Sequence, residues 1–225
     1  MRARDQRLVP VELDALPELT PRLAQVAADG EKTSEDFFEA HIRTPVPGFV
    51  PCDFVASGRA LTAVWAQHLA PGPAFCEWGS GVGAVTVIAS LLGFDAVGIE
   101  IDADLVATSR ELAQRAASRA RFIHGSFIPE GHDDIADETG GDMAWLITGA
   151  EAGYTELGLE IDDFDVIFAY PWPGEESVLE NLFIDHAAAG ALLITYNGVE
   201  GVRVARKKPA RRDAHHKPGR TTRRR

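Results

Sequence analysis

Apolar residues recur along the chain in short runs that alternate with stripes at helical spacing. The short runs predict buried strands at residues 74–76, 96–102, 121–124, 164–169 and 191–196. The stripes predict helices at residues 84–92, 102–119 and 175–189, and Gly93 is placed to end the first of them. Strands that alternate with helices predict an α/β fold, with a doubly wound, mostly parallel sheet and helices on both of its faces.

The first 70 residues form a helical preface to this pattern. Prolines break a first helix over 11–28, which Asp29-Gly30 ends, and the hydroxyls of Thr33-Ser34 begin a second helix. A proline-rich loop over 44–53 follows. We interpret the helices as a cover over one edge of the core, and the alternative is a cap over a bound ligand. The loop fits a plain linker and a segment that closes over a ligand equally well.

A glycine-rich turn follows the strand at 74–76, in the sequence Glu77-Trp78-Gly79-Ser80-Gly81-Val82-Gly83-Ala84. Glycine at every second position lets the backbone turn sharply and approach a ligand closely. The helix that follows is expected to begin with free N–H groups and the positive end of its dipole. The turn therefore predicts a binding site for a nucleotide phosphate or a carboxylate.

An acid, Glu100, lies near the end of the next apolar run, seventeen residues after Gly83. A carboxylate at this place accepts hydrogen bonds from both hydroxyls of a ribose, which suits NAD and S-adenosylmethionine equally. We expect Glu100 to bind ribose and its neighbour Ile101 to line the same site. Asp102 or Asp104 is the better candidate for a cap on the following helix.

The glycine turn matches two families. Gly79-x-Gly81-x-x-Ala84 fits the alanine-ended dinucleotide fingerprint. Glu77-x-Gly79-x-Gly81-x-Gly83 resembles the first motif of the class I S-adenosylmethionine-dependent methyltransferases. This resemblance implies a Rossmann-like fold with S-adenosyl-L-methionine as cofactor. It also implies that Glu77 helps to hold the ammonium of the methionine moiety, while the loop Gly79, Ser80, Gly81 and Gly83 takes the rest of that moiety.

The resemblance assigns the adenine contacts to the end of the third strand. In the methyltransferase pattern an acid or a small polar residue stands there, and this chain has Gly125-Ser126-Phe127. We expect Ser126 to hydrogen-bond the adenine and Phe127 to cover its ring. The acid that is usual in the family is absent.

The strand at 164–169 runs into an aromatic and proline-rich turn, Tyr170-Pro171-Trp172-Pro173. It resembles the fourth strand of class I methyltransferases, whose end carries the target-binding motif. In amino-group methyltransferases that motif is often Asn/Asp-Pro-Pro-Tyr/Phe, and Tyr170 replaces its first residue. An amine target is therefore not carried over from the family.

Three residues of this region are the predicted catalytic residues. Tyr170 and Trp172 are expected to frame the acceptor beside the cofactor, with Tyr170 contacting both, and Glu175 to take a proton from the attacking group. A dehydrogenase would need a catalytic His or Lys here, and no Lys occurs between Lys32 and Lys207.

Charge is distributed unevenly along the chain. Residues 1–201 hold 11 Lys and Arg against 33 Asp and Glu, and residues 202–225 hold 11 against one acid, which gives −22 and +10 within the total of −12. An acidic insertion over 130–163 holds eleven acids and no Lys or Arg. We interpret it as a solvated insertion pinned by Trp145; the alternatives are an acidic lip for a cationic substrate and a dock for the basic end of the chain.

The C-terminal end departs from the family. Only residues 198–205 stand between the last predicted strand and the basic tail, so we expect a shortened C-terminal hairpin and a domain over 71–205. The tail over 206–225 has no apolar stripe and is expected to be disordered. It is a candidate contact for nucleic acid or for the acidic body.

Composition bears on the number of domains and on the cellular location of the protein. A 225-residue chain that is 45% hydrophobic suits one α/β domain with additions. No apolar run is long enough to span a membrane, no signal peptide is evident, and two cysteines suit a reduced, cytoplasmic location. His132 stands beside Asp133 and Asp134, as a metal ligand could, but a mobile acidic loop explains this sequence better. No metal site is therefore expected.

The sequence therefore predicts a methyltransferase that uses S-adenosyl-L-methionine and acts on a protein amine, an RNA or a small molecule. Two alternatives remain: an NAD-dependent oxidoreductase, and a module that binds an adenosyl cofactor without catalysis.

Overall fold

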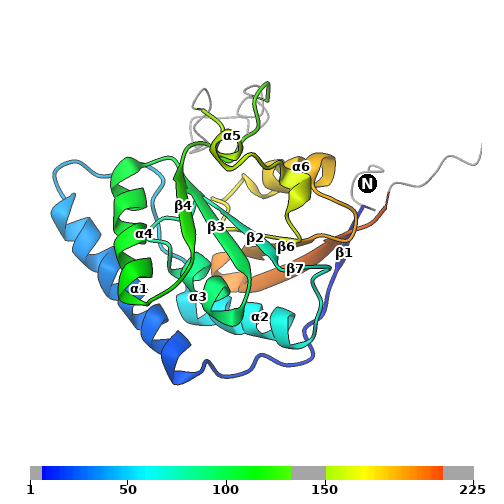
Figure 1. Ribbon diagram of the computed structural model, residues 1–225, viewed down its shortest axis with the longest axis horizontal. Coiled ribbons are helices and arrows are strands. Elements are labelled where there is room, and N and C mark those ends of the chain that lie inside the picture. Colours follow the sequence, from blue (N-terminus) through cyan, green and yellow to red (C-terminus); the bar gives the residue numbers. More distant parts are fainter. Residues whose placement is uncertain (1–6, 133–150, 210–225) are drawn as a thin grey trace, which may run out of the picture.

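The computed structural model describes residues 7–132 and 151–209, which form one sheet between two layers of helices (Figure 1). The strands are β1 (Leu8–Pro10), β2 (Ala74–Trp78), β3 (Asp95–Glu100), β4 (Arg121–His124), β5 (Val166–Ala169), β6 (Leu192–Tyr196) and β7 (Val202–Lys207). The helices are α1 (Pro21–Ala40), α2 (Phe54–Ala66), α3 (Ala84–Leu92), α4 (Ala103–Arg115), α5 (Gly153–Leu157) and α6 (Glu176–His186), with short 3₁₀ turns at Ile161–Asp163 and Gly198–Glu200.

The sheet has the order β1-β7-β6-β5-β2-β3-β4. Strands β2 to β6 pair in parallel with one another, and β7 runs antiparallel to β6. Because parallel strands end at the same edge, the carboxyl ends of β5, β2 and β3 lie side by side in that order. Ligands of open α/β sheets bind at such an edge.

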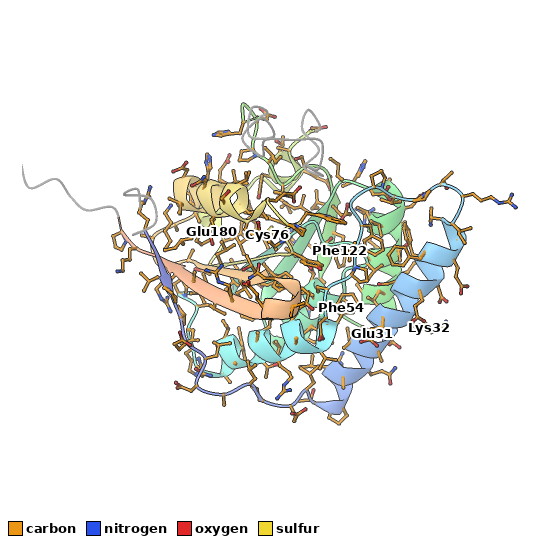
Figure 2. All side chains as sticks on the ribbon, turned by 180° about the vertical axis from the view of Figure 1, so that it is seen from behind. Glu31, Lys32, Phe54, Cys76, Phe122 and Glu180 are labelled. Carbon is orange, nitrogen blue, oxygen red and sulfur yellow. The ribbon has the colours of Figure 1, made fainter. Side chains whose placement is uncertain are left out.

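Each face of the sheet has its own core. One cluster joins the sheet to α1, α2, α3 and α4, and it includes Phe54 and Phe122 (Figure 2). The other joins the sheet to α5 and α6, and it includes Cys76. The two-sided packing explains why the strands are apolar on both faces, and it confirms the predicted fold class.

The end of the sheet is built differently from the expected ending. One strand, β7, follows β6 in the described part of the chain, and its six residues form a regular hairpin with β6. The outer strand comes from the other end of the chain: Leu8–Pro10 pairs antiparallel with residues 205–207. The predicted shortening of the C-terminal hairpin is therefore compensated by an N-terminal strand.

The predicted start of the tail at 206 is wrong. Arg206 and Lys207 belong to β7, and Arg206 donates hydrogen bonds to the carbonyls of Gly190 and Leu69. Lys207 is buried and its Nζ donates to the Ala187 carbonyl. Arg and Lys can bury their aliphatic stems in a folded domain while their charged ends find polar partners. A run of basic residues therefore does not by itself mark the end of the folded domain. Residues 210–225 lie outside the described residues.

Before the proline-rich loop, the preface contains one long helix where two were predicted. Helix α1 begins at Pro21 with Thr20 as its N-cap and runs through Asp29-Gly30 without interruption. Gly30 is buried, and a Cβ at this position would lie 2.6 Å from the Cβ of Ala84 in α3. The glycine therefore permits close packing of two helices, and tertiary contact overrides its low helix propensity.

The last part of the predicted acidic insertion belongs to the core. Ser126 and Ala152 form a parallel bridge, and Tyr154 and Ile161 are buried. The interpretation of 130–163 as a solvated insertion is thus wrong for residues 152–154 and for Ile161, whereas the four acids of 152–163 are exposed. Trp145, its proposed anchor, lies outside the described residues. None of the helices described is long and apolar enough to cross a membrane.

Candidate functional site

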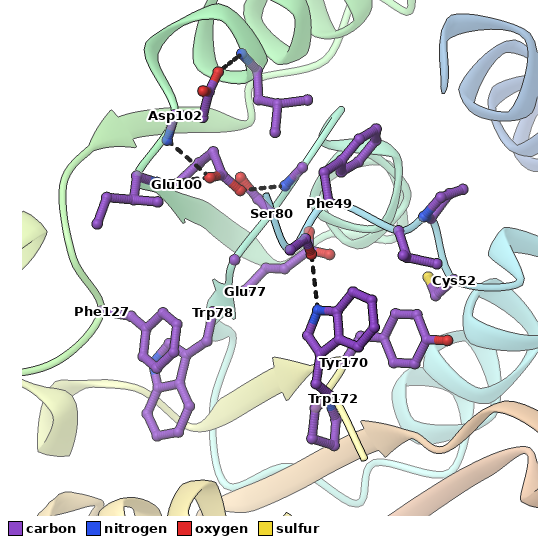
Figure 3. Close-up of a pocket in the computed structure, with 18 of the residues that line it drawn as sticks. Phe49, Cys52, Glu77, Trp78, Ser80, Glu100, Asp102, Phe127, Tyr170 and Trp172 are labelled. Carbon is purple, nitrogen blue, oxygen red and sulfur yellow. Dashed lines mark hydrogen bonds between the residues drawn. The ribbon is translucent and has the colours of Figure 1, made fainter. Parts of the chain in front are cut away.

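A cavity of about 400 Å³ lies over the carboxyl ends of β5, β2 and β3 (Figure 3). Four parts of the chain meet there: the proline-rich loop, the glycine turn after β2, the ends of β3 and β4, and the turn after β5. Its lining includes nine of the predicted site residues: Glu77, Gly79, Ser80, Gly81, Glu100, Ile101, Ser126, Phe127 and Tyr170. Trp172 and Glu175 also line it.

The glycine turn faces its own amides into the protein. Gly79, Gly81 and Gly83 all have positive φ, at 70°, 53° and 81°. The amides of Gly79 and Ser80 both donate to the carbonyl of Ile99, at 3.0 and 3.1 Å, and Gly83 donates to Ser80. The amide of Gly81 donates to Glu100, at 2.8 Å. These four N–H groups are thus engaged within the fold. The free N–H groups were expected at the start of the helix, where the Thr86 amide donates to Glu77 and the Val87 amide donates to the Gly83 carbonyl.

Gly83 does not line the cavity. A Cβ at this position would lie 2.6 Å from the ring of Phe122 and 2.7 Å from the Cβ of Ser109. The third glycine is therefore required for packing of α3 against α4 and β4. Gly79 differs, because a Cβ there would meet nothing within 4 Å and would project into open space.

Glu77 places a carboxylate at the N-terminus of α3. Its Oε2 accepts hydrogen bonds from the Thr86 amide, at 2.9 Å, and from the Thr86 hydroxyl. The side chain is only 5% exposed, and burial raises its pKa to about 8, against the partial lowering by the Thr86 hydrogen bonds. An acid therefore already occupies the place where a helix N-terminus attracts anions.

Glu100 joins the end of β3 to the glycine turn. Its Oε1 accepts from the amides of Ile101 and Asp102, at 2.8 and 3.0 Å, and its Oε2 accepts from Gly81. Burial raises its pKa, and the three amides act in the opposite direction. A carboxylate has about four acceptor positions, so it retains capacity for a donor from a ligand. Asp102 caps α4 as predicted, by accepting from Asp104 and Leu105.

The two buried acids lack a basic partner in the described part of the chain. Neither Glu77 nor Glu100 forms an ion pair with a side chain of residues 7–132 or 151–209. Among these residues, none that lines the cavity is a Lys, Arg or His. Ser80 adds a buried hydroxyl without a hydrogen-bond partner. Buried charges are normally paired, so this cavity favours a ligand that brings positive charge and hydrogen-bond donors.

Ser126 and Phe127 lie at the β4 side of the cavity. The Ser126 hydroxyl accepts from the amide of Ile128, at 3.0 Å, which shapes this loop. Phe127 stacks on Trp78 with ring centroids 5.4 Å apart and planes 10° apart (Figure 3). The flat aromatic wall is compatible with the predicted adenine contact, whereas Ser126 already has a structural role.

The turn after β5 forms the other end of the cavity. Tyr170 packs edge to face against Tyr196, with ring centroids 5.0 Å apart. Glu175 is 5% exposed and accepts from the Trp172 amide at 3.3 Å. All three predicted catalytic residues are therefore brought together at the β5 side.

The proline-rich loop covers the cavity. The indole Nε1 of Trp172 donates to the carbonyl of Gly48, at 2.9 Å (Figure 3). Phe49 lies over the glycine turn, since a Cβ on Gly81 would be 2.9 Å from its ring, and it stacks on Phe38. The loop is thus a cover and not a plain linker.

The lining or supporting residues that sequence reasoning missed include Phe49, Cys52, Trp78 and Thr86. The sequence could have indicated Thr86, because it is a hydroxyl residue in the first turn of the helix that follows the glycine motif. That motif begins with an acid, Glu77, with which such a hydroxyl can form a hydrogen bond. Cys52 gave no signal; burial raises the pKa of its thiol to about 12, so the thiol stays protonated.

Histidines meet at a separate place. His132 and His186 approach to 3.1 Å between their Nε2 atoms. In the described ranges no group of three or more His, Cys, Asp or Glu is arranged to hold a metal ion. Asp133 and Asp134 lie outside those ranges.

Comparisons with known proteins give one similar sequence and many similar folds. No family model matches the chain. Over 79 residues the chain is 35% identical to the ribosomal protein L11 methyltransferase of Thermus thermophilus. These residues make up 34% of this chain and 31% of that protein. The chain thus spans less than a third of the length of this curated relative.

Two solved structures give the scale of the structural likeness. An RNA methyltransferase from Salinibacter ruber, in complex with S-adenosyl-L-homocysteine, has 17% identity and a TM-score of 0.45, over 77% of this chain and 98% of that chain. A methyltransferase from Geobacter sulfurreducens has 17% identity and a TM-score of 0.47, over 86% and 93%. Part of the chain is thus similar in sequence to a methyltransferase.

Proposed function

We propose that this protein is an S-adenosylmethionine-dependent methyltransferase. The observation that carries the proposal is the buried carboxylate of Glu77 at the N-terminus of α3. A dinucleotide needs that position, and the amides of the glycine turn, for its pyrophosphate. Here the position holds an acid and four of the amides are engaged within the fold. The place of the pyrophosphate is thus taken, and a cationic ligand would favour the ionised form of Glu77.

The residues of the cavity fit the parts of this cofactor. Glu77 would accept from the ammonium of the methionine moiety, and Glu100 would accept from the ribose hydroxyls. The unpartnered hydroxyl of Ser80 and the open space beside Gly79 leave room for the methionine moiety. Ile101 and the stacked pair of Phe127 and Trp78 would provide an apolar wall for the adenine.

The cofactor supplies a methyl group on a sulfonium, whose departure leaves a neutral thioether. The chain therefore needs no general acid for the leaving group. Its residues have to hold the acceptor in line and exclude water, and orientation of this kind supplies much of a rate acceleration. The cover by Phe49, tied down through Trp172 and Gly48, supports that role. Tyr170 would orient the acceptor, and Glu175 would take its proton.

The partners and the location are proposals as well. The tail over 210–225 is basic, which suits a contact with nucleic acid or with the acidic body. Both cysteines are free in the structure, which supports a cytoplasmic location.

Transfer of label from methyl-labelled S-adenosylmethionine into a cell extract tests the proposal. The extract is separated into protein, RNA and small molecules after the reaction. We expect label in one fraction with the wild-type protein and little label with Tyr170→Phe, because Tyr170 stands at the β5 end of the cavity. Unchanged affinity for S-adenosyl-L-homocysteine in Tyr170→Phe is the control. Cofactor binding without transfer to any fraction would favour a non-catalytic module.

A further inference from the structure

The cavity has two ends with different chemistry. Its β3 end holds Glu100, its centre holds Glu77 and the glycine turn, and its β5 end holds the turn over 170–175. If the proposed function is correct, the ribose lies at the β3 end and the methionine moiety at the centre. The acceptor then approaches at the β5 end, and the groups there decide which chemical class it belongs to.

The backbone of the β5 end offers no amide to an anion. Pro171 and Pro173 have no N–H group. The amide of Trp172 donates to the carboxylate of Glu175, and that of Gly174 donates to Glu176, at 2.8 Å. The amide of Glu175 donates to the carbonyl of Trp172. Every N–H of residues 171–175 is therefore either missing or engaged.

The side chains at this end are equally poor partners for an anion. The indole N–H of Trp172 donates to the Gly48 carbonyl, and the Trp172 side chain lines the cavity. Glu175 contributes a carboxylate that is 5% exposed. Within the described residues no Lys, Arg or His lines the cavity. A carboxylate, phosphate or phenolate would have to be buried there beside an acid, which is strongly unfavourable.

The same groups suit a cation. A carboxylate accepts strong hydrogen bonds from an ammonium group, and the faces of Tyr170 and Trp172 attract positive charge. We infer that the methyl acceptor is an amine that enters as an ammonium group and binds between Glu175 and these two rings. This inference rests on the proposed function and names the class of its acceptor.

The transfer step balances with the groups present. The ammonium gives one proton to the Glu175 carboxylate, which restores the nitrogen lone pair. The lone pair forms the new N–C bond while the S–C bond breaks, and its electron pair stays on sulfur. The product is a methylated ammonium, and the proton on Glu175 leaves to solvent.

Binding of simple probes tests the inference without knowledge of the natural acceptor. Wild-type protein is first titrated with S-adenosyl-L-homocysteine by calorimetry, and the loaded protein is then titrated with n-butylammonium, butyrate and n-butanol. We expect n-butylammonium to bind at least about tenfold more tightly than either other probe. Similar affinity for all three, or a preference for butyrate, would overturn the inference.

Two variants locate the preference. Glu175→Gln keeps an oxygen that accepts from the Trp172 amide and removes the charge, so we expect it to bind n-butylammonium no better than n-butanol. Glu180→Gln is the matched control, because Glu180 lies on α6, the helix that Glu175 precedes, outside the cavity, and pairs with Arg203. An unchanged preference in Glu175→Gln would contradict the placement of the ammonium.

The outcomes distinguish a failure of the proposed function from a failure of the proposed acceptor class. If S-adenosyl-L-homocysteine does not bind, the proposed function and the acceptor class both fail. If it binds but n-butylammonium is not preferred, the function stands and the acceptor class falls. Product analysis identifies the source of the amine: label on nitrogen in the protein fraction indicates an amino acid side chain, and label on nitrogen in the small-molecule fraction indicates a free amine. Alkali-labile label, or label in RNA bases, would contradict the inference.

Discussion

The two ends of the cavity are built in different ways. At the β3 end, Glu100 is fixed by amides of its own neighbours, Ile101 and Asp102, and by Gly81 of the adjacent turn. At the β5 end, Trp172 is fixed by the carbonyl of Gly48, 124 residues away in the sequence. Short-range motifs thus set up the β3 end, and long-range contacts set up the β5 end.

The largest effect is expected for Glu100→Ala. The substitution removes the acceptor of three backbone amides and the group that would bind ribose. We expect the affinity for S-adenosyl-L-homocysteine to fall at least about a hundredfold, or about 2.7 kcal/mol, in a calorimetric titration. Glu111→Ala, an exposed glutamate on α4, is the control and should bind normally. Unchanged binding in Glu100→Ala would refute the assignment of this residue.

Glu77→Gln should separate stability from binding. Burial raises the pKa of Glu77 to about 8, so the folded protein keeps this carboxyl protonated at pH values where the unfolded chain, with a pKa of about 4.5, has lost the proton. The stability that the proton contributes is complete below about pH 4.5 and is lost as the pH rises through 8. The uncharged variant should therefore be more stable than wild type by about 1–3 kcal/mol near pH 8.5, measured by chemical unfolding.

Binding by the same variant should change in the opposite direction. Affinity for S-adenosylmethionine should fall about tenfold or more in Glu77→Gln, because its ammonium loses an ionised partner. In wild type the affinity should rise from about pH 5.5 to 7.5 as Glu77 ionises, and Glu77→Gln should lose this dependence. A variant that is less stable and binds normally would assign Glu77 a purely structural role.

Phe49→Ala tests the cover, with a smaller effect. Loss of the ring over the glycine turn should raise the dissociation rate of S-adenosyl-L-homocysteine about tenfold, measured by stopped-flow fluorescence, since most interface changes act on that rate. Phe38→Ala is the control: Phe38 stacks on Phe49 but does not line the cavity. Equal rates in Phe49→Ala and wild type would show that the loop does not retain the cofactor.

The smallest effect is expected for removal of the tail. Deletion of 210–225 leaves all of β7 and every described lining residue in place, so the affinity for S-adenosyl-L-homocysteine should change less than about twofold. Label transfer into the RNA or protein fraction is measured in parallel. A drop in transfer without a change in cofactor affinity would assign the tail to the acceptor.

The contrast between the ends also explains what sequence reasoning achieved. The five parallel strands and the helices between them follow from local apolar periodicity. Gly79, Gly81 and Glu100 follow from spacing within one strand–turn–helix–strand unit, and Glu77 follows from the family resemblance. What failed depends on contacts that no local pattern records. Gly30 is a helix breaker by propensity but a packing residue beside Ala84, and Leu8–Pro10 becomes a strand only because β7 presents an open edge.

The central claim is that two buried carboxylates grip a cationic adenosyl cofactor. Calorimetric titration of the wild-type protein with S-adenosylmethionine and with NAD⁺ at neutral pH tests it most directly. The account predicts micromolar binding of S-adenosylmethionine with release of a proton from Glu77, and no binding of NAD⁺. Binding of NAD⁺, or no binding of any adenosyl compound, would contradict it.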